Sequence, residues 1–598
     1  MIIYFNFWIL ILKLFLFSIL IISNVLGYSQ LFKKIFKIDD DNLLNNYIYG
    51  SSIMVLFSYS INFFLPLSPS ITNSLFLFFS LIGIFKLYQN IKKNLPLLIL
   101  ILVTVFVIFL YSPSYNDYEL YHLPYMELIR KFKIIFGISN LDFRYAHSSV
   151  FQNISAIQYN SLMKLDSYIF HAPILSIIIL VFLFRKLKTS SNFLIFIFSL
   201  VSLIYFILHG SRYGSLGNDL PAHLLAIYAL ILFIEICEGK SREYFLFLNI
   251  ILLLIFSKFS LIFYLLLPIY IIFKEKSLFL GLSKLKIIFL IGLVLLFLIK
   301  NFINSSCLIY PLSFSCFDVR WSPKEYSFGS AKTISKESSV MVKAYMEADS
   351  SYISKIREST IQELMTDSIY ENLNKSDKEE FIKFYVYEEY SKIKNWFPIF
   401  LKSKDFKKFL NKSLLLNFIL FLIFFYLVKR KKFFPTSDSK IFLNFNYKLF
   451  LIIFISISFI FWIFSFPQLR YGISYALLFC SIPTLIYFNI YFHKKNMLVF
   501  YNFAKFLILL AIAHAIFTNL LRISQKISIQ NNFSLFSNIV TINTVDKISL
   551  IKVNNFNIIQ PHYGVCSNLE QLCSVFAERF YNTNRGIYLS NLNYLFIY

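Results

Sequence analysis

The stretch SPSYNDYELYHLPYMELIRKF (residues 112–132) and its continuation KIIFGISNLDFRYAHSSVF (residues 133–151) interrupt a chain that is otherwise typical of membrane-spanning sequence. Apolar runs lie on both sides, at 97–110 and at 168–184. Many ionisable residues crowd into the stretch, among them Asp117, Glu119, His122, Glu127, Arg130, Asp142, Arg144 and His147. Because ionisable groups are costly in the bilayer core, we expect a loop at the membrane surface with its acids near the preceding helix. The alternative is an ordinary solvated loop that contains an interfacial helix.

The composition excludes a soluble globular protein. Of the 598 residues, 58% are hydrophobic and only 15% are charged. Apolar runs of about 15 to 22 residues recur along the chain, which is the signature of transmembrane helices. The net charge of +25 does not indicate nucleic-acid binding, because the Lys and Arg residues cluster at the ends of apolar runs, where they orient helices and attract anionic lipids.

The basic clusters alternate with the apolar runs and predict the topology. By the positive-inside rule the clusters at 33–37, 92–93, 185–188, 239–243, 274–276, 429–432 and 494–495 lie in the cytoplasm. This places the segments 112–167, 209–221, 301–409, 465–472 and 523–598 outside. Lys258 interrupts the apolar stretch 244–273, so we expect it to mark a break between two short helices or to face a wet cavity. The resulting fold class is all-α and polytopic, with about fourteen transmembrane helices.

Four regions follow from this topology. Residues 1–300 form an N-terminal transmembrane region with the outer loop 112–167, and residues 301–409 form an extracytoplasmic helical segment. Residues 410–522 form the C-terminal transmembrane helices, and residues 523–598 an extracytoplasmic tail. The expected location is a bacterial inner membrane, with the large loop and the C-terminus in the periplasm.

Four cysteines fall in segments that the topology places outside. Cys307 and Cys316 are close in sequence, and so are Cys566 and Cys573. An even number of closely spaced cysteines in an oxidising compartment predicts two disulfides, Cys307–Cys316 and Cys566–Cys573. The alternative is that these thiols are unpaired.

Two further polar residues stand out on the predicted outer side. Asp219 lies in the short loop before an apolar run, where it would also serve as an ordinary helix cap. Arg470 lies in the tight turn SFPQLRYG, residues 465–472. A guanidinium there is well suited to holding a phosphate, because it offers paired donors, although a snorkelling membrane anchor has the same composition.

Six short motifs, in a specific order, carry a resemblance. They are NDYELYHLP (116–124), GISNLDFR (137–144), NDLP (218–221), NFINSSCLIYP (301–311), PQLRYG (467–472) and CSNLEQLC (566–573). The pattern resembles the GT-C class of membrane glycosyltransferases, and more closely a family of uncharacterised polytopic bacterial membrane proteins. Ser306 departs from that pattern, which has Gly there, and so do Ala146 and His147, where the pattern has Gly and a small polar residue.

The resemblance implies a GT-C-like fold and a glycosyltransferase that uses a polyprenyl-phosphate-linked sugar and an envelope glycan or lipid acceptor. It implies Asp117 as the general base, with Glu119 as the second candidate. Arg470 and Arg144 would hold the lipid phosphate, while Asp219 and His122 would bind substrate. Asp219 would also be the place for a divalent cation, which some enzymes of this class need. Three alternatives remain. One is a lipid-linked glycan flippase or other transporter, the second is an O-antigen ligase or polymerase, and the third is a non-catalytic structural membrane protein.

Overall fold

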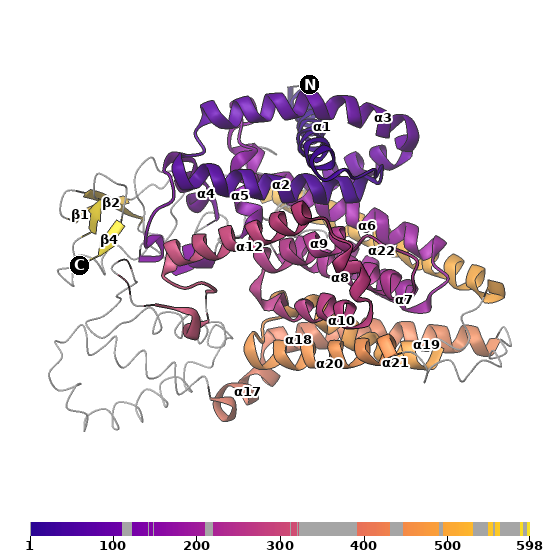
Figure 1. Cartoon of the computed structure of the whole chain (residues 1–598). Helices are drawn as coiled ribbons and strands as arrows, with labels where there is room; N and C mark the ends of the chain where they lie inside the picture. The colour runs from indigo at the N-terminus through magenta and orange to yellow at the C-terminus, as the bar shows by residue number, and fades with distance from the viewer. Residues whose placement is uncertain are drawn as a thin grey trace.

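A computed structural model describes most of the helical body of the protein. Its backbone is described for residues 2–109, 122–140, 143–147, 149–209, 219–310, 312–317, 319, 321, 392–430, 446–488 and 494–529, and for four strands between 548 and 597. Figure 1 shows the long helices lying side by side in one bundle, with the short helices α4 and α5 and the tail strands toward one end.

The first three helices pack closely because glycines stand where they cross. They are α1 (Ile2–Phe36), α2 (Leu43–Phe64) and α3 (Pro69–Phe109). A Cβ atom on Gly83 would lie 1.6 Å from the carbonyl oxygen of Ser23, and one on Gly27 would lie 1.8 Å from that of Phe79. Small residues allow such backbone contact between membrane helices, where packing rather than the hydrophobic effect holds helices together.

The region 112–167 forms a layer of short elements on one end of the bundle. Its described parts are α4 (Leu123–Lys131), the 3₁₀ turns η2 (Ile138–Asn140) and η3 (Phe143–His147), α5 (Val150–Ile157) and η4 (Lys164–Ile169). Most side chains of α4 and all those of α5 are buried. The N–H of Gly137 donates to the carbonyl of Ile303 at 2.8 Å, and Asn62 donates to the carbonyl of Ile129 at 3.1 Å. The described part of the loop is therefore packed on the bundle and is not an ordinary solvated loop.

The elements that follow along the chain form the centre of the bundle and its neighbouring helices. They are α6 (His171–Thr189), α7 (Phe193–Leu208), α8 (Asp219–Cys237), α9 (Tyr244–Ser257), η6 (Phe259–Leu265), α10 (Leu266–Lys274), α11 (Lys276–Leu280), α12 (Lys284–Ser305) and the short turn η7 (Ser313–Ser315). Helices α7 and α8 are buried along nearly their whole length. Helix α12 instead exposes apolar side chains such as Ile288, Ile291 and Leu295. That composition is expected of a helix face against lipid.

The C-terminal part adds more helices and then a small amount of strand. The helices are α17 (Ile393–Lys402), α18 (Lys404–Phe409), the π-turn η8 (Leu410–Leu414), α19 (Leu415–Arg430), α20 (Asn446–Ser465), α21 (Leu469–Phe488) and α22 (Lys494–Ile529). Strands β1 (Ile548–Val553) and β2 (Phe556–Pro561) pair antiparallel with Ile551 opposite Ile558, and β3 (Ile587–Leu589) pairs with β4 (Leu595–Ile597). The body of the protein is all-helical, as the sequence predicts, and these four short tail segments, which contain several of the β-branched residues that favour strands, are the exception.

The structure supports a polytopic membrane protein. Nine helices among the described residues are long and apolar enough to cross a membrane, and three shorter apolar helices accompany them. The predicted count of fourteen is not confirmed. One difference is α3, a continuous helix of 41 residues that runs through the predicted cytoplasmic cluster at 92–93 and into the apolar run 97–110.

Side-chain contacts bring together the helix ends that carry two of the predicted basic clusters. At one end the ion pair Lys186–Glu235 and the hydrogen bonds Tyr447–Glu238 and Asn45–Glu243 tie together α2, α6, α8, α9 and α20. The predicted cytoplasmic clusters at 185–188 and 239–243 lie at this end. Asp219, Lys258 and Arg470 meet at the opposite end. Of the predicted regions, most of 301–409 and of 523–598 lies outside the described residues.

Candidate functional site

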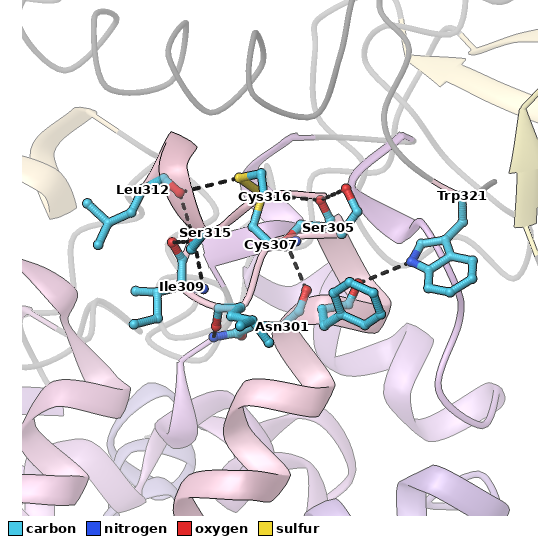
Figure 2. The surroundings of a disulfide bond; sticks show 11 residues. Asn301, Ser305, Cys307, Ile309, Leu312, Ser315, Cys316 and Trp321 are labelled. Atoms are coloured by element: carbon cyan, nitrogen blue, oxygen red, sulfur yellow. Dashed lines mark hydrogen bonds between the residues drawn. A yellow bond between two sulfur atoms is a disulfide. The ribbon is translucent and has the colours of Figure 1, made fainter. Parts of the chain in front are cut away.

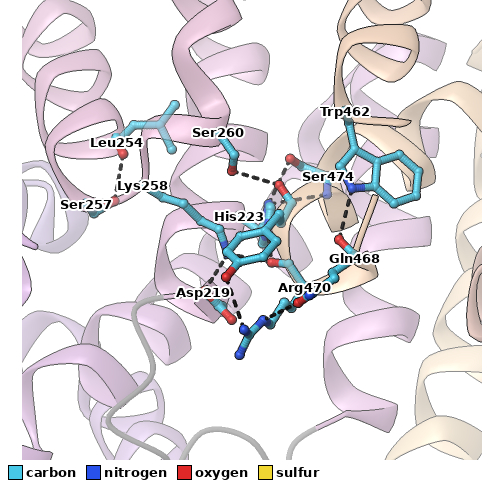
Figure 3. Close-up of polar contacts among 11 residues, drawn as sticks. Asp219, His223, Leu254, Ser257, Lys258, Ser260, Trp462, Gln468, Arg470 and Ser474 are labelled. Carbon is cyan, nitrogen blue, oxygen red and sulfur yellow. Dashed lines mark hydrogen bonds and ion pairs between the residues drawn. The ribbon is translucent and has the colours of Figure 1, made fainter. Parts of the chain in front are cut away.

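Asp219 and Arg470, predicted separately as substrate-binding residues, lie together in the structure. Asp219 is the first residue of α8, and Arg470 is in the first turn of α21. Lys258 connects them, because its ammonium group forms an ion pair with the carboxylate of Asp219 and donates a 2.5 Å hydrogen bond to the carbonyl of Arg470. Figure 3 shows the Lys258 side chain reaching from the end of α9 toward both residues. We call this group, together with His223, the charged cluster.

Lys258 lies at a break in the helix, as its place in an apolar stretch predicts. It is the C-cap of α9, with φ −153° and ψ 105°, and the 3₁₀ turn η6 begins at the next residue. The extended backbone at this position ends α9 and turns the side chain toward α8 and α21. A lysine in an apolar run is costly in lipid, and here the cost is offset by an ion pair at the end of a helix.

His223 links two sides of an irregular turn in α21. Its Nε2–H donates to the carbonyl of Arg470 at 2.9 Å, and its Nδ1 accepts from the hydroxyl of Ser474 at 3.0 Å and from the Ser474 N–H at 3.4 Å. In a regular helix that N–H would donate to that carbonyl. Gly472, between them, has the non-helical angles φ −135° and ψ 22°. The imidazole therefore holds the backbone of Arg470 in place across the irregular turn.

The turn before α21 is shaped by an aromatic side chain. The indole of Trp462 donates to the carbonyl of Gln468 at 3.0 Å. A Cβ atom on Gly472 would lie 2.2 Å from the Trp462 ring, so only glycine fits at this close approach. The side-chain oxygen of Gln468 in turn accepts from Nε of Arg470 at 3.0 Å. These contacts therefore fix the position of the Arg470 side chain.

Tyr471 lies between the two cations of the charged cluster. The Lys258 ammonium is 4.6 Å from the centre of its ring and the Arg470 guanidinium is 4.9 Å from it. Arg470 also donates from Nη2 to the Tyr471 hydroxyl at 3.1 Å, and Ser260 donates to the Tyr471 carbonyl at 2.9 Å. The ring face is a favourable surface for positive charge, so it stabilises two cations near each other.

The charged cluster is open on the side of the acid. The side chain of Asp219 is 39% exposed, whereas that of Lys258 is 6% exposed. The charged cluster places two cationic side chains, those of Lys258 and Arg470, beside the exposed carboxylate of Asp219, and guanidinium and ammonium groups are suited to binding an anionic group. No set of three metal-ligating side chains occurs among the described residues.

The other predicted site residues lie elsewhere. His122 precedes α4 and is buried, where its Nδ1 accepts from Gln152 Nε2 at 2.7 Å. Arg144 lies in η3, whose Ala146 packs on the disulfide segment described next. None of the described contacts joins either residue to the charged cluster. Asp117, Glu119, Cys566 and Cys573 lie outside the described residues.

Cys307 and Cys316 are joined by a disulfide, which is the pairing expected from the sequence. The bridge, shown in Figure 2, closes a hairpin after α12. In this hairpin the N–H of Leu308 donates to the carbonyl of Ser315 at 3.0 Å, and the N–H of Phe317 donates to the carbonyl of Ser306 at 2.9 Å. Ser306 caps α12 in the left-handed conformation, with φ 57°. That conformation favours glycine, which gives a physical reason for the Gly that the resembling family has at this position.

Sequence reasoning missed His223, Ser260 and Ser474. His223 had a detectable signal, because it follows Asp219 by four residues and therefore shares its side of α8. Ser260 and Ser474 had none, since hydroxyl side chains are common in apolar helices.

Comparisons with known proteins give one result. No curated protein and no solved structure matches the chain. A family model matches residues 9–370, a range that includes Asp219, His223 and Lys258 and ends before Arg470. Because this range is more than half of the 598 residues, the chain belongs to the family described as a domain of unknown function (DUF8201).

Proposed function

We propose that this protein is a membrane glycosyltransferase of GT-C type, which moves a sugar from a polyprenyl-phosphate donor to a cell-envelope acceptor on the outer face of a bacterial inner membrane. The observation that carries the proposal is the meeting of Lys258 and Arg470 beside the exposed carboxylate of Asp219. A transferred sugar leaves a lipid phosphate behind, and paired cations at the end of a helix bundle are suited to that phosphate.

In the proposed reaction, the acceptor hydroxyl oxygen attacks the anomeric carbon of the donor sugar, and the bond from that carbon to the phosphate oxygen breaks. Asp117 takes the hydroxyl proton as general base, with Glu119 as its substitute. The phosphate leaves with the bonding electron pair and gains negative charge. Arg470 grips it through its planar fork, and Lys258 adds a second charge.

Lys258 takes the role that the resemblance gives to Arg144, because Lys258 contacts both Asp219 and Arg470. Asp219 holds Lys258 in place through the ion pair and offers its exposed oxygen to the acceptor. His223 positions Arg470 by binding its carbonyl.

The test is sugar transfer from a labelled polyprenyl-phosphate sugar in membranes that carry each variant at matched expression. Asp117→Asn keeps the size of the side chain but cannot take a proton, so transfer should fall by roughly a hundred- to ten-thousandfold. Arg470→Lys keeps the charge but loses the fork, so it should only impair transfer. Glu119→Gln should be milder than Asp117→Asn.

The matched control for Arg470→Lys is Arg130→Lys, the same substitution at a residue that pairs with Glu127 on α4. It should leave transfer unchanged. Full activity in both Asp117→Asn and Glu119→Gln would contradict the glycosyltransferase proposal and favour a glycan flippase. Flippase activity is measured as the movement of a labelled lipid-linked glycan across the membrane of sealed vesicles. A ligase or polymerase would instead join preformed glycans without using a single-sugar donor.

A further inference from the structure

Lys300, near the end of α12, is a buried lysine whose surroundings differ from those of Lys258. Its side chain lies in the interior, and the residue is 2% exposed. Its ammonium group donates to the side-chain oxygen of Asn153 at 2.9 Å. It also lies 4.6 Å from the ring centre of Tyr59 and 5.4 Å from that of Tyr125.

No carboxylate among the described residues pairs with Lys300, whereas Lys258 has Asp219 and Lys186 has Glu235. Aromatic faces and one amide oxygen stabilise an ammonium group only in part. A buried charge without an opposite charge is costly. Among the residues that the structure describes, the surroundings of Lys300 therefore contain no anion.

The groups around Lys300 are also short of hydrogen-bond acceptors. The hydroxyl of Tyr59 is buried and has no hydrogen-bond partner among the described residues. The hydroxyl of Tyr125 accepts from the amide of Asn304 at 3.2 Å. A ligand that completes this layer accepts hydrogen bonds, and a negatively charged one would also stabilise the charged form of the Lys300 amine.

A small half-open cavity lies beside this layer. Its volume is about 10 Å³, and its lining includes Asn62, Tyr125, Lys133, Ile134, Lys300 and Asn304. A cavity of this size holds one water-sized atom. It therefore admits a single oxygen atom of a larger group that remains at the mouth.

The lining has two cations and no acid, together with an apolar side formed by Ile134, Ile135 and Ile138. A phosphate monoester carries nearly two negative charges near neutral pH, which suits two lysines better than the single charge of a carboxylate. We infer that the cavity between α2, α4 and α12 binds a phosphate monoester group, with one phosphate oxygen against Lys300 and with Lys133 as the second cation. The source of that group is either a lipid headgroup or free phosphate. The inference does not depend on the proposed sugar transfer.

Binding can be measured on the full chain in detergent by native mass spectrometry. The probes are phosphatidic acid, a lipid phosphate monoester, and inorganic phosphate as a competitor, with phosphatidylcholine as the reference lipid. Lys300→Met, which keeps the length and apolar stem of the side chain, should weaken phosphatidic acid binding by about ten- to a hundredfold. The matched control is Lys164→Met, the same change at an exposed lysine outside the cavity, and it should change binding less than about twofold.

Stability gives a second readout that separates a ligand site from a structural lysine. Without lipid, Lys300→Met should be as stable as the natural protein or more stable, because it replaces a buried amine, whose charged form has no counter-ion among the described residues, by an apolar side chain of similar length. A clear loss of stability, or unchanged lipid binding, would overturn the inference. Lys133→Met leaves the buried layer intact and should weaken binding about threefold, so it decides the question if Lys300→Met does not fold. If equimolar inorganic phosphate displaces phosphatidic acid, the cavity is a phosphate site whose ligand is free phosphate and not a lipid.

Discussion

The ion pair between Lys258 and Asp219 predicts an asymmetry between two substitutions. Asp219→Asn removes the carboxylate charge and leaves the Lys258 ammonium, whose side chain is 6% exposed, without its counter-ion. Lys258→Met leaves the carboxylate of Asp219, whose side chain is 39% exposed and remains in contact with solvent. The first change should therefore destabilise the protein more than the second.

The magnitude follows from what each substitution leaves behind. Removing one partner of a buried ion pair costs about 3–5 kcal/mol, because an uncompensated charge remains in the interior. That range applies to Asp219→Asn. After Lys258→Met, the remaining carboxylate keeps its contact with solvent, and the contacts of the ammonium with Asp219, the Arg470 carbonyl and the Tyr471 ring are lost. We expect this loss to lower the free energy of unfolding by about 1.5–3 kcal/mol. The expected difference between the two variants is about 2 kcal/mol.

The assay is reversible unfolding of the purified protein from mild detergent by sodium dodecyl sulfate, followed by helical circular dichroism. The matched control is the pair Lys186–Glu235, whose two side chains are 21% and 17% exposed. Glu235→Gln and Lys186→Met should cost nearly equal free energies, because neither residue is much better hydrated than the other. Equal costs for Asp219→Asn and Lys258→Met, or a larger cost for Lys258→Met, would refute the reasoning.

Three further predictions concern the framework around the site. Gly83→Ala should destabilise the protein by about 1–3 kcal/mol, because its Cβ would lie 1.6 Å from a backbone oxygen. The control Gly292→Ala, whose Cβ would have nothing within 4 Å, should be neutral or stabilising. Equal thermal stabilities of the two variants would contradict the close helix contact. Ser306→Gly should raise the free energy of unfolding by about 1 kcal/mol, because it relieves the left-handed backbone, and a lowered value in urea or detergent titration would disprove this. Removing the Cys307–Cys316 bridge by Cys307→Ser should lower the free energy of unfolding by about 2–3 kcal/mol. Peptide mapping that finds both thiols free in the natural protein would exclude the bridge.

Local properties of the sequence determined much of the architecture. The apolar runs predicted the long helices, because transfer of about twenty consecutive residues into lipid depends on those residues alone. The basic clusters at 185–188 and 239–243 predicted two helix ends that lie together, and Lys258 predicted the break between α9 and η6. The count of spans and the strands of the tail were not predicted, because short or marginal segments depend on what they pack against.

The site itself was decided by tertiary structure. Asp219 and Arg470 were singled out one at a time, but their meeting through Lys258, and the role of His223 between distant helices, depend on how α8 and α21 are rotated against each other. Helix α8 is apolar on all sides, so nothing in its periodicity indicates which face meets a given neighbour. The same holds for Lys300, because an isolated lysine in an apolar run has the same sequence signature whether an acid or two tyrosine rings surround it. Which partner it meets is set by side-chain packing among α2, α4, α5 and α12, and only the folded chain contains that information.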